Sequence, residues 1–224
     1  MKKTGKNTFF IQKWWISDSQ IAKLKKRVYG ILQKKYPFIN WHLTSINDRP
    51  YAQEIVVSVQ KYVNKGNICG IIEVGCGLGD IIGNIRRGKG CKKIGFDTDA
   101  AVVKAAAILH PSVIFKQGSF KDVPIYVRGG GNCLIIVDFI HTMSEEELKA
   151  EMEKILTTGG IDLIVFDTFV RHENTVYKYS HIGERFLGNQ YQCVKKSKGF
   201  AAAQGARRYI EYWEKQLSEK KSKQ

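Results

Sequence analysis

The chain has 224 residues, of which 43% are hydrophobic, and a formal net charge of +15. This length and composition suit one globular domain with a single core, and no apolar run approaches the roughly 18 residues that span a bilayer, which excludes a transmembrane segment. The five cysteines are odd in number and lack C-x-x-C spacing, which argues against disulfides and a zinc site and favours a cytoplasmic protein.

The charge divides the chain into three parts. Residues 1–66 hold 13 Lys or Arg and 3 acids, whereas residues 67–194 are close to neutral, with 14 and 15. Basic residues prevail again over residues 195–224, with 9 against 3. We expect a basic N-terminal helical cap over residues 1–66, a globular domain over residues 67–217 and a disordered basic tail over residues 218–224.

The first expected element is a helix over residues 19–36, SQIAKLKKRVYGILQKKY. Its apolar residues form one stripe at helical spacing: Ile21, Leu24, Val28, Ile31 and Leu32. Basic residues crowd the rest of its surface. Such a helix could meet RNA, an anionic membrane surface or an acidic substrate, and a solvated face of a helix that caps the core is the simpler alternative.

A second helix is expected over residues 49–66, RPYAQEIVVSVQKYVNKG. Its apolar residues recur at helical spacing: Tyr51, Ile55, Val59 and Tyr62. The helix should pack on a sheet and end before Gly66, a favourable residue after a helix C-terminus. Several residues before it are candidates to cover an active site or to stack on nucleobases, with ordinary core packing as the alternative: Trp14, Trp15, Phe38, Trp41 and His42.

Residues 71–82, IIEVGCGLGDII, are the most informative stretch of the chain. An apolar, β-branched run leads to Glu73, three glycines follow at alternate positions, and a second apolar run begins. The pattern predicts a buried strand, a tight glycine turn and the start of a helix. Glycines in such a turn let a ligand approach the backbone without meeting a Cβ atom. A nucleotide-like cofactor is therefore expected at the carboxyl end of this strand.

The spacing of the glycines discriminates between cofactors. A dinucleotide fingerprint, G-x-G-x-x-G, sets a pyrophosphate on a helix N-terminus, whereas this turn is G-x-G-x-G and has a carboxylate two residues before it. The segment resembles motif I, E/D-x-G-x-G-x-G, of the class I S-adenosylmethionine-dependent methyltransferases. The resemblance implies that Glu73 meets the charged methionine end of S-adenosyl-L-methionine. The backbone of the turn would contact it at Gly75, Cys76, Gly77 and Gly79. An αβ turn without a ligand is the alternative.

Residues 92–99, KKIGFDTD, predict a second short strand that ends at Asp97, 24 residues after the acid of the glycine motif. An acid at this point can accept hydrogen bonds from both ribose hydroxyls, which assigns Asp97 and the neighbouring Thr98 to the cofactor site. Asp99 is expected to cap the helix over residues 100–109, and the same capping role is the alternative for Asp97.

The segment VIFKQGSF, residues 113–120, predicts the third strand and the loop that follows it. In the family this loop brackets the adenine, often through an acid that follows a glycine, but here the residue is Ser119. We therefore expect backbone groups of Ser119 and Phe120, and not an acidic side chain, to flank the adenine.

Residues 133–160 predict a strand, a loop, an amphipathic helix and a Gly-Gly turn, and residues 161–169 predict the following strand. Ser144 and Glu147 form a capping box before the helix. This layout resembles motif IV, its helix and the L-x-x-G-G turn of the same family, so the resemblance covers about residues 68–169.

Asp138 and Asp167 are expected to end adjacent parallel strands, about 4.8 Å apart, and Asp138 is included in the cofactor site. Catechol-type O-methyltransferases place magnesium on such a pair with an Asn after the second acid. Thr168 stands there instead, and no metal is expected.

His141 is the candidate catalytic base, with a structural histidine as the alternative. Weaker candidates follow the fifth strand: Tyr177, Tyr179, His181 and Arg185.

Residues 191–200 and 206–215 alternate like two further strands, joined by a loop that holds GFAAAQG. All elements together predict an α/β fold, a three-layer Rossmann-like sandwich. Its mostly parallel seven-stranded sheet has a C-terminal antiparallel strand pair, and a helical cap precedes it. On the family resemblance, residues 67–217 would form the S-adenosylmethionine-binding methyltransferase domain.

The resemblance implies transfer of a methyl group to an O or N acceptor on a small molecule or glycan-type metabolite. The chain lacks the [D/N]-P-P-[Y/F] of enzymes that methylate amino groups of adenine or glutamine, and it lacks the Pro-Cys nucleophile of pyrimidine C5 methylation. Two alternatives stay open: an RNA methyltransferase docked through the basic flanks, with salt-dependent binding, and a non-catalytic subunit that keeps the fold and anchors a partner. The sequence does not indicate an oligomeric state.

Overall fold

The computed structural model describes residues 18–44, 46–86, 88, 90–170 and 176–216, and every structural statement below concerns these residues. The tail over residues 218–224, Trp14, Trp15 and the side chains of Ile21 and Trp41 lie outside this description.

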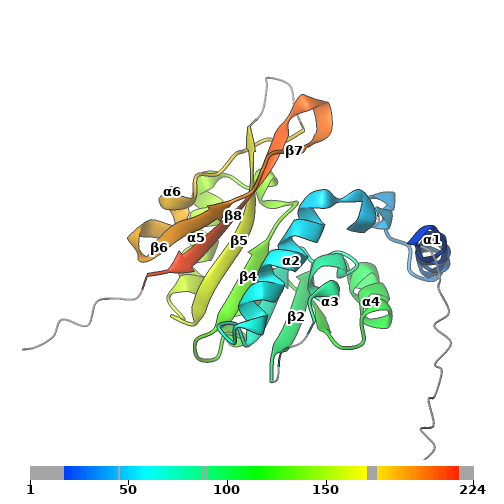
Figure 1. The fold of residues 1–224 in the computed structure, drawn as a ribbon, viewed down its shortest axis with the longest axis horizontal. Coiled ribbons are helices and arrows are strands. Elements are labelled where there is room, and N and C mark those ends of the chain that lie inside the picture. The colour runs from blue at the N-terminus through cyan, green and yellow to red at the C-terminus, as the bar shows by residue number, and fades with distance from the viewer. Residues whose placement is uncertain (1–17, 45, 87, 89, 171–175, 217–224) are drawn as a thin grey trace, which may run out of the picture.

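Strands and helices alternate along most of the chain, as expected for an α/β protein (Figure 1). The described strands are β1 Gly70–Val74, β2 Lys92–Asp97, β3 Ile114–Gln117, β4 Asn132–Ile136, β5 Ile161–Val170, β6 Tyr191–Lys196, β7 Phe200–Ala201 and β8 Arg207–Lys215. The described α-helices are α1 Asp18–Lys35, α2 Pro50–Asn64, α3 Asp80–Asn84, α4 Ala100–Leu109, α5 Glu145–Leu156 and α6 Gly183–Leu187. Short 3₁₀ turns are η1 Asn40–Leu43, η2 Ile46–Asp48, η3 Phe120–Ile125, η4 Ile140–Thr142, η5 Gly188–Gln190 and η6 Ala203–Gly205. Within the described ranges, every helix is too short or too polar to traverse a lipid bilayer.

The strands form one sheet in the order β3-β2-β1-β4-β5-β8-β6, with the two-residue β7 paired to β8 outside this order. Strands β1 to β5 are parallel, and β8 lies antiparallel between β5 and β6. This confirms the predicted sheet and its C-terminal strand pair, with β7 as a short addition. The strand order reverses between β1 and β4, and open α/β sheets bind ligands at the carboxyl ends of the strands beside such a reversal.

Helices cover both faces of the sheet. Because alternate side chains of a strand point to opposite faces, Ile71 and Ile135 pack with α2 and α3, whereas Ile72 and Leu134 pack with α5 and α6. The three-layer sandwich is therefore confirmed, with α2 lying across one face of the sheet (Figure 1).

The predicted helix boundaries have the expected capping groups. The side chain of Asp99 accepts the N–H groups of the first turn of α4, and Ser144 with Glu147 forms the capping box of α5. Gly66 follows α2 in the left-handed conformation, with φ of 78°. These local signals fix where the connecting turns leave the helices.

The predicted apolar stripe of α1 is wrong in part. Tyr29 and Leu32 are buried, in a cluster with residues of α4 and the glycine turn, whereas Leu24 and Ile31 are 58% and 67% exposed. The helix packs on a small patch, so only one narrow side of it is covered. The predicted stripe did not include Tyr29, whose ring is buried while its hydroxyl donates to Asp80 at 2.7 Å.

Candidate functional site

The turn between β1 and α3 has its three glycines in the left-handed region, with φ of 69° at Gly75, 53° at Gly77 and 78° at Gly79. A side chain at any of them would strain the backbone. An added Cβ would lie 2.6 Å from the ring of Phe139 at Gly75 and 2.5 Å from the ring of Phe115 at Gly79. The turn therefore needs glycine both for its conformation and for the close approach of neighbouring groups.

Asp97 lies at the carboxyl end of β2, beside the glycine turn. Its carboxylate accepts the N–H of Gly77 at 2.9 Å and the N–H of Asp99 at 3.0 Å. His42 of η1 covers the same turn, because a Cβ added to Gly77 would lie 3.2 Å from its Nδ1 atom. Burial lowers the pKa of His42 against the opposing effect of Asp97 and Asp99, which leaves its ring neutral at pH 7.

Glu73 lies near the end of β1 and is only 2% exposed. Its carboxyl group accepts the N–H of Ile82 in α3 at 3.0 Å. Burial raises the pKa of Glu73 to about 8, although the Ile82 N–H and the nearby Arg49 act in the opposite sense. A cationic group of a ligand placed here would favour the charged form of this carboxyl group.

Arg49 is a site residue that the sequence patterns do not indicate. It immediately precedes α2, donates to Asp80 over 2.5 Å and lies 4.0 Å from Asp138. Its Nε atom is buried and has no hydrogen-bond partner among the described residues. Buried donors are nearly always paired, so Nε is a candidate donor to a bound ligand.

These groups line a cavity of about 50 Å³ at the carboxyl ends of β1 and β4. The lining residues are His42, Arg49, Glu73, Gly75, Cys76, Gly77, Leu78, Asp80, Ile81, Val137 and Asp138. Among the cofactor contacts predicted from sequence, the cavity brings together Glu73, Gly75, Cys76, Gly77 and Asp138, whereas Gly79 and Asp97 are not among its lining residues. It adds Arg49 and Asp80, and its lining includes His42, which the sequence analysis named as a candidate cover.

Asp138 and Asp167 do lie together, but a guanidinium group bridges them. Arg208 of β8 donates to Asp138 and lies 3.6 Å from Asp167, and Asp167 accepts the N–H of Asp138 at 3.0 Å. The Arg208 side chain is 5% exposed and lies between the rings of Tyr51, at 4.0 Å, and Phe169, at 5.0 Å. Arg208 thus places a positive charge between the two carboxyl groups.

Asp138 has an unusual backbone conformation for a residue with a side chain, with φ of 73°. Its carboxylate also accepts the hydroxyl of Tyr51 at 2.5 Å, in addition to the contact with Arg208. Left-handed non-glycine residues persist only where the surroundings hold them, and they cluster at functional sites. The loop after β4 is therefore held in one conformation by residues of α2 and β8.

His141 lies in an aromatic cluster next to this acid–arginine group. Its ring contacts Phe169 and Tyr177 at centroid distances of 5.5 and 5.0 Å, and Phe169 also contacts Arg208. Its Nδ1 atom is buried without a hydrogen-bond partner among the described residues. Burial and the charge of Arg208 lower the pKa of His141 more than the charge of Asp138 raises it. The ring is therefore neutral at pH 7.

The residues predicted near an adenine lie on the other side of the turn. Ser119 precedes η3 and forms a capping box with Asp122, so its hydroxyl and its N–H are both engaged. Phe120 is buried, with its ring 5.6 Å from the ring of Phe139. Thr98 is exposed after the end of β2. Among these residues, Phe120 is the one that the structure connects to the turn, through Phe139.

The weaker candidates after β5 have structural partners. His181 is buried, with Nε2 2.8 Å from the carbonyl oxygen of Ile140, and Arg185 pairs with Glu145 on the surface. Tyr179 donates its backbone N–H to the carbonyl of His141. Only Tyr177 contributes its ring to the His141 cluster.

No protein-family model and no curated protein matches the sequence. Solved structures do match the fold. Magnesium protoporphyrin IX methyltransferase (ChlM) from Synechocystis PCC 6803, with bound SAH, has a TM-score of 0.59 and 13% identity over 89% of this chain and 100% of that one. The bifunctional kinase-methyltransferase WbdD has a TM-score of 0.53 and 14% identity over 75% of this chain and 40% of that one. The methyltransferase domain of a bacterial Hen1 has a TM-score of 0.51 and 13% identity over 72% of this chain and 97% of that one.

The fold is therefore that of the Rossmann-like class I methyltransferases. The match to the ChlM structure covers 89% of this chain, and the fold agrees with the resemblance in the sequence motifs.

Proposed function

We propose that this chain is an S-adenosylmethionine-dependent methyltransferase. The observation that carries the proposal is the glycine turn, whose three left-handed residues lie between the buried carboxyl groups of Glu73 and Asp97. Two solved structures with this fold are described with bound SAH and bound SAM, which supports the choice of cofactor.

The residues present fit the chemistry of this cofactor, which has an ammonium, a carboxylate, a sulfonium and two ribose hydroxyls but no phosphate. Glu73 would pair with the ammonium and Arg49 with the carboxylate, through its unpartnered Nε atom. Asp97 keeps acceptor capacity for ribose hydroxyls, because each carboxylate oxygen has two lone pairs. The remaining contacts would come from Gly75, Cys76, Gly77, Gly79, Thr98, Ser119, Phe120 and Asp138.

Binding needs two side chains to move. A cavity of about 50 Å³ holds a few water molecules, which is too small for a nucleoside. His42 and Phe139 lie against Gly77 and Gly75, where the cofactor would approach the backbone. We therefore expect both rings to be displaced when the cofactor binds, and His42 to act as part of a movable cover.

The bound cofactor would supply a methyl group that is already activated for displacement. The protein then has to align the acceptor and exclude water. His141 would accept the proton of the acceptor at Nδ1, which has no partner among the described residues, once the acceptor displaces a neighbouring group and reaches this buried nitrogen. The rings of Phe169 and Tyr177 hold it in place.

We assign the acceptor to the region of Asp138 and His141, as an O or N group on a small molecule or glycan-type metabolite. The ChlM structure, a methyltransferase named for a small molecule, supports a substrate of this size. An RNA acceptor, held by the basic flanks, is the second candidate because the positive charge is concentrated outside the central domain. A non-catalytic binding subunit is the third, and the intact glycine turn argues against it.

Calorimetric titration with S-adenosylmethionine and with its demethylated product tests the proposal. Wild-type protein should bind both, and Asp97→Asn should weaken binding at least about tenfold through loss of charged hydrogen bonds. Asp99→Asn is the matched control, since it changes the neighbouring carboxylate but keeps a good helix cap. Absence of binding to the wild type would contradict the methyltransferase and RNA readings together.

Transfer of a radiolabelled methyl group into a cell extract, with and without ribonuclease, then identifies the acceptor. Label that resists ribonuclease and moves with small molecules or glycolipids supports the proposed acceptor class. Label that ribonuclease releases as nucleotides supports the RNA alternative instead.

A further inference from the structure

The outward side of α1 has a composition that the proposed function does not use. Leu24, Arg27, Ile31 and Lys34 are all exposed, and we call these four residues the α1 strip. Successive members are three or four residues apart, so they lie along one side of the helix over almost three turns. The strip therefore alternates aliphatic and cationic side chains on one continuous surface.

Further exposed residues extend the strip. Lys23 and Lys35 flank it on α1, and Ile39 follows the helix with 67% of its surface exposed. No acidic residue occurs between Asp18 and Asp48 in the sequence. Within the described part of the chain, none of the exposed cations of α1 is in an ion pair. The surface is thus strongly positive and partly apolar.

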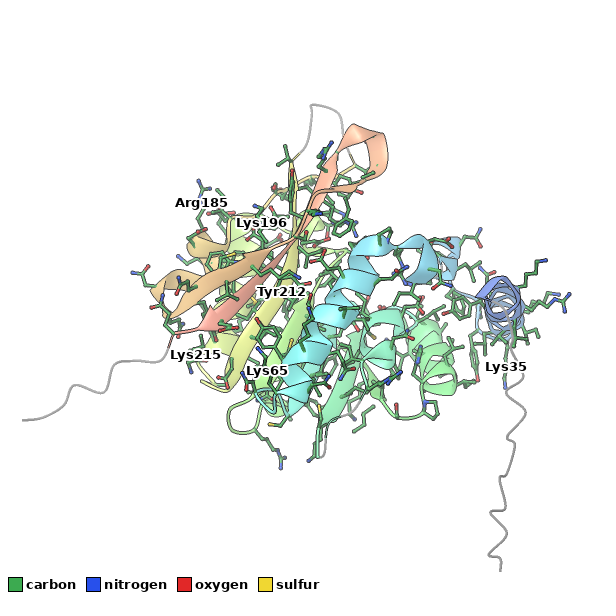
Figure 2. All side chains as sticks on the ribbon, in the orientation of Figure 1. Lys35, Lys65, Arg185, Lys196, Tyr212 and Lys215 are labelled. Atoms are coloured by element: carbon green, nitrogen blue, oxygen red, sulfur yellow. The ribbon has the colours of Figure 1, made fainter. Side chains whose placement is uncertain are left out.

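The opposite side of α1 is fixed to the body of the protein. Tyr29 and Leu32 pack with Leu78 and Val102, and the hydroxyl of Tyr29 donates to Asp80 at 2.7 Å. Figure 1 shows α1 at the edge of the molecule, beyond α4 and away from the sheet, and Figure 2 shows Lys35 on this outer helix. The strip is therefore held in a defined orientation and faces away from the rest of the described chain.

We propose that the α1 strip docks on an anionic membrane surface. Lys and Arg are attracted to anionic headgroups, and aliphatic side chains between them can enter the boundary of the acyl region. RNA would also attract the cations, but it binds apolar side chains mainly by stacking bases on aromatic rings, whereas the apolar residues of the strip are aliphatic.

Co-sedimentation of the full chain with lipid vesicles tests this proposal. The vesicles would be pure phosphatidylcholine, or phosphatidylcholine with about a third of phosphatidylglycerol. Leu24→Ser with Ile31→Ser removes the aliphatic part of the strip, and Arg27→Gln with Lys34→Gln removes its charge. Val57→Ser with Ile125→Ser is the matched control, because these residues are similarly exposed, at 57% and 67%, on other elements. Thermal unfolding verifies that each variant is folded.

Wild-type protein should bind the anionic vesicles and not the neutral ones. Each strip variant should reduce that binding at least about fivefold, and the control should stay within about twofold. Equal binding to both vesicle types, or unchanged binding by the Leu24 and Ile31 variant, would overturn the proposal. If single-stranded RNA also binds and only the charge variant weakens both ligands, the strip is a general polyanion surface and the lipid assignment is wrong. None of these measurements requires a cofactor, so they are independent of the proposed methyl transfer.

Discussion

Replacing Glu73 by Gln should change how the stability of the protein depends on pH. In the folded protein the pKa of this carboxyl group is raised from 4.5 to about 8, chiefly by burial. In the unfolded chain it has its ordinary value. Between these two values the folded state keeps a proton that the unfolded state has released, so the free energy of unfolding falls as the pH rises. Gln has a similar shape, can still accept the N–H of Ile82, and does not titrate.

The size of the effect follows from the pKa difference. Each pH unit within the window changes the free energy of unfolding by about 1.4 kcal/mol, so the wild type should lose about 4 kcal/mol through Glu73 between pH 5 and pH 8. This is a large share of the roughly 5–15 kcal/mol that stabilises a typical domain. Asp167 also has a raised pKa, because burial outweighs the attraction of Arg208, but it contributes equally to both proteins. The difference between them therefore isolates Glu73.

Urea denaturation at pH 5, 6, 7 and 8 measures this difference. The free energy of unfolding of the Glu73→Gln variant, relative to that of the wild type, should rise at each pH step. The difference between the two proteins should therefore be largest at pH 8. Glu153→Gln, the same change on the exposed side of α5, should give a curve parallel to the wild type. Parallel curves for the Glu73 variant would refute the raised pKa. The same variant should bind S-adenosylmethionine more weakly, because Gln cannot pair with its ammonium.

Two further substitutions test the turn and the acid pair. Gly75→Ala should abolish cofactor binding and destabilise the protein by about 1–3 kcal/mol more than Gly66→Ala. Both glycines have positive φ, but only a Cβ at Gly75 would meet an aromatic ring. Similar losses of stability for the two variants in urea denaturation would contradict the close approach of Phe139 to Gly75. Arg208→Met should destabilise by about 3–5 kcal/mol at pH 8, since it leaves the buried Asp167 without a counter-ion among the described residues and leaves Asp138 with Arg49, 4.0 Å away. Its cost should shrink toward pH 5, where Asp167 is protonated, and a cost independent of pH would contradict that explanation.

Local signals in the sequence predicted much of the fold. The glycine turn, the cap at Asp99 and the capping box at Ser144 each depend on residues within a few positions of one another. Continuous apolar runs likewise predicted the buried parallel strands, and alternation predicted the C-terminal strand pair. These features are confirmed, and the roles assigned to individual cofactor contacts stay predictions.

The sequence analysis did not identify the basic and tyrosine side chains that contact Asp138 and Asp80. Arg208 and Tyr51 meet Asp138 from 70 and 87 residues away, and Arg49 meets Asp80 from 31 residues away. No local spacing marks such pairs, because they form only when α2 and β8 pack beside the ends of the parallel strands. The orientation of α1 could not be predicted for a similar reason, since a helix that covers a small patch has several equivalent apolar sides.

The place of β8 in the sheet has a consequence for the candidate site. Among the described strands, β6 pairs only with β8, although β6 is synthesised first. In the described sheet, β6 is therefore joined to the rest of the strands only through β8, which pairs with β5 on its other side. Arg208 lies on this strand, so the guanidinium group that contacts both Asp138 and Asp167 is in place only when β8 is paired with β5. Without β8 in the sheet, the acid–arginine group beside the candidate site would be incomplete, so the integrity of the site depends on the last described strand of the chain.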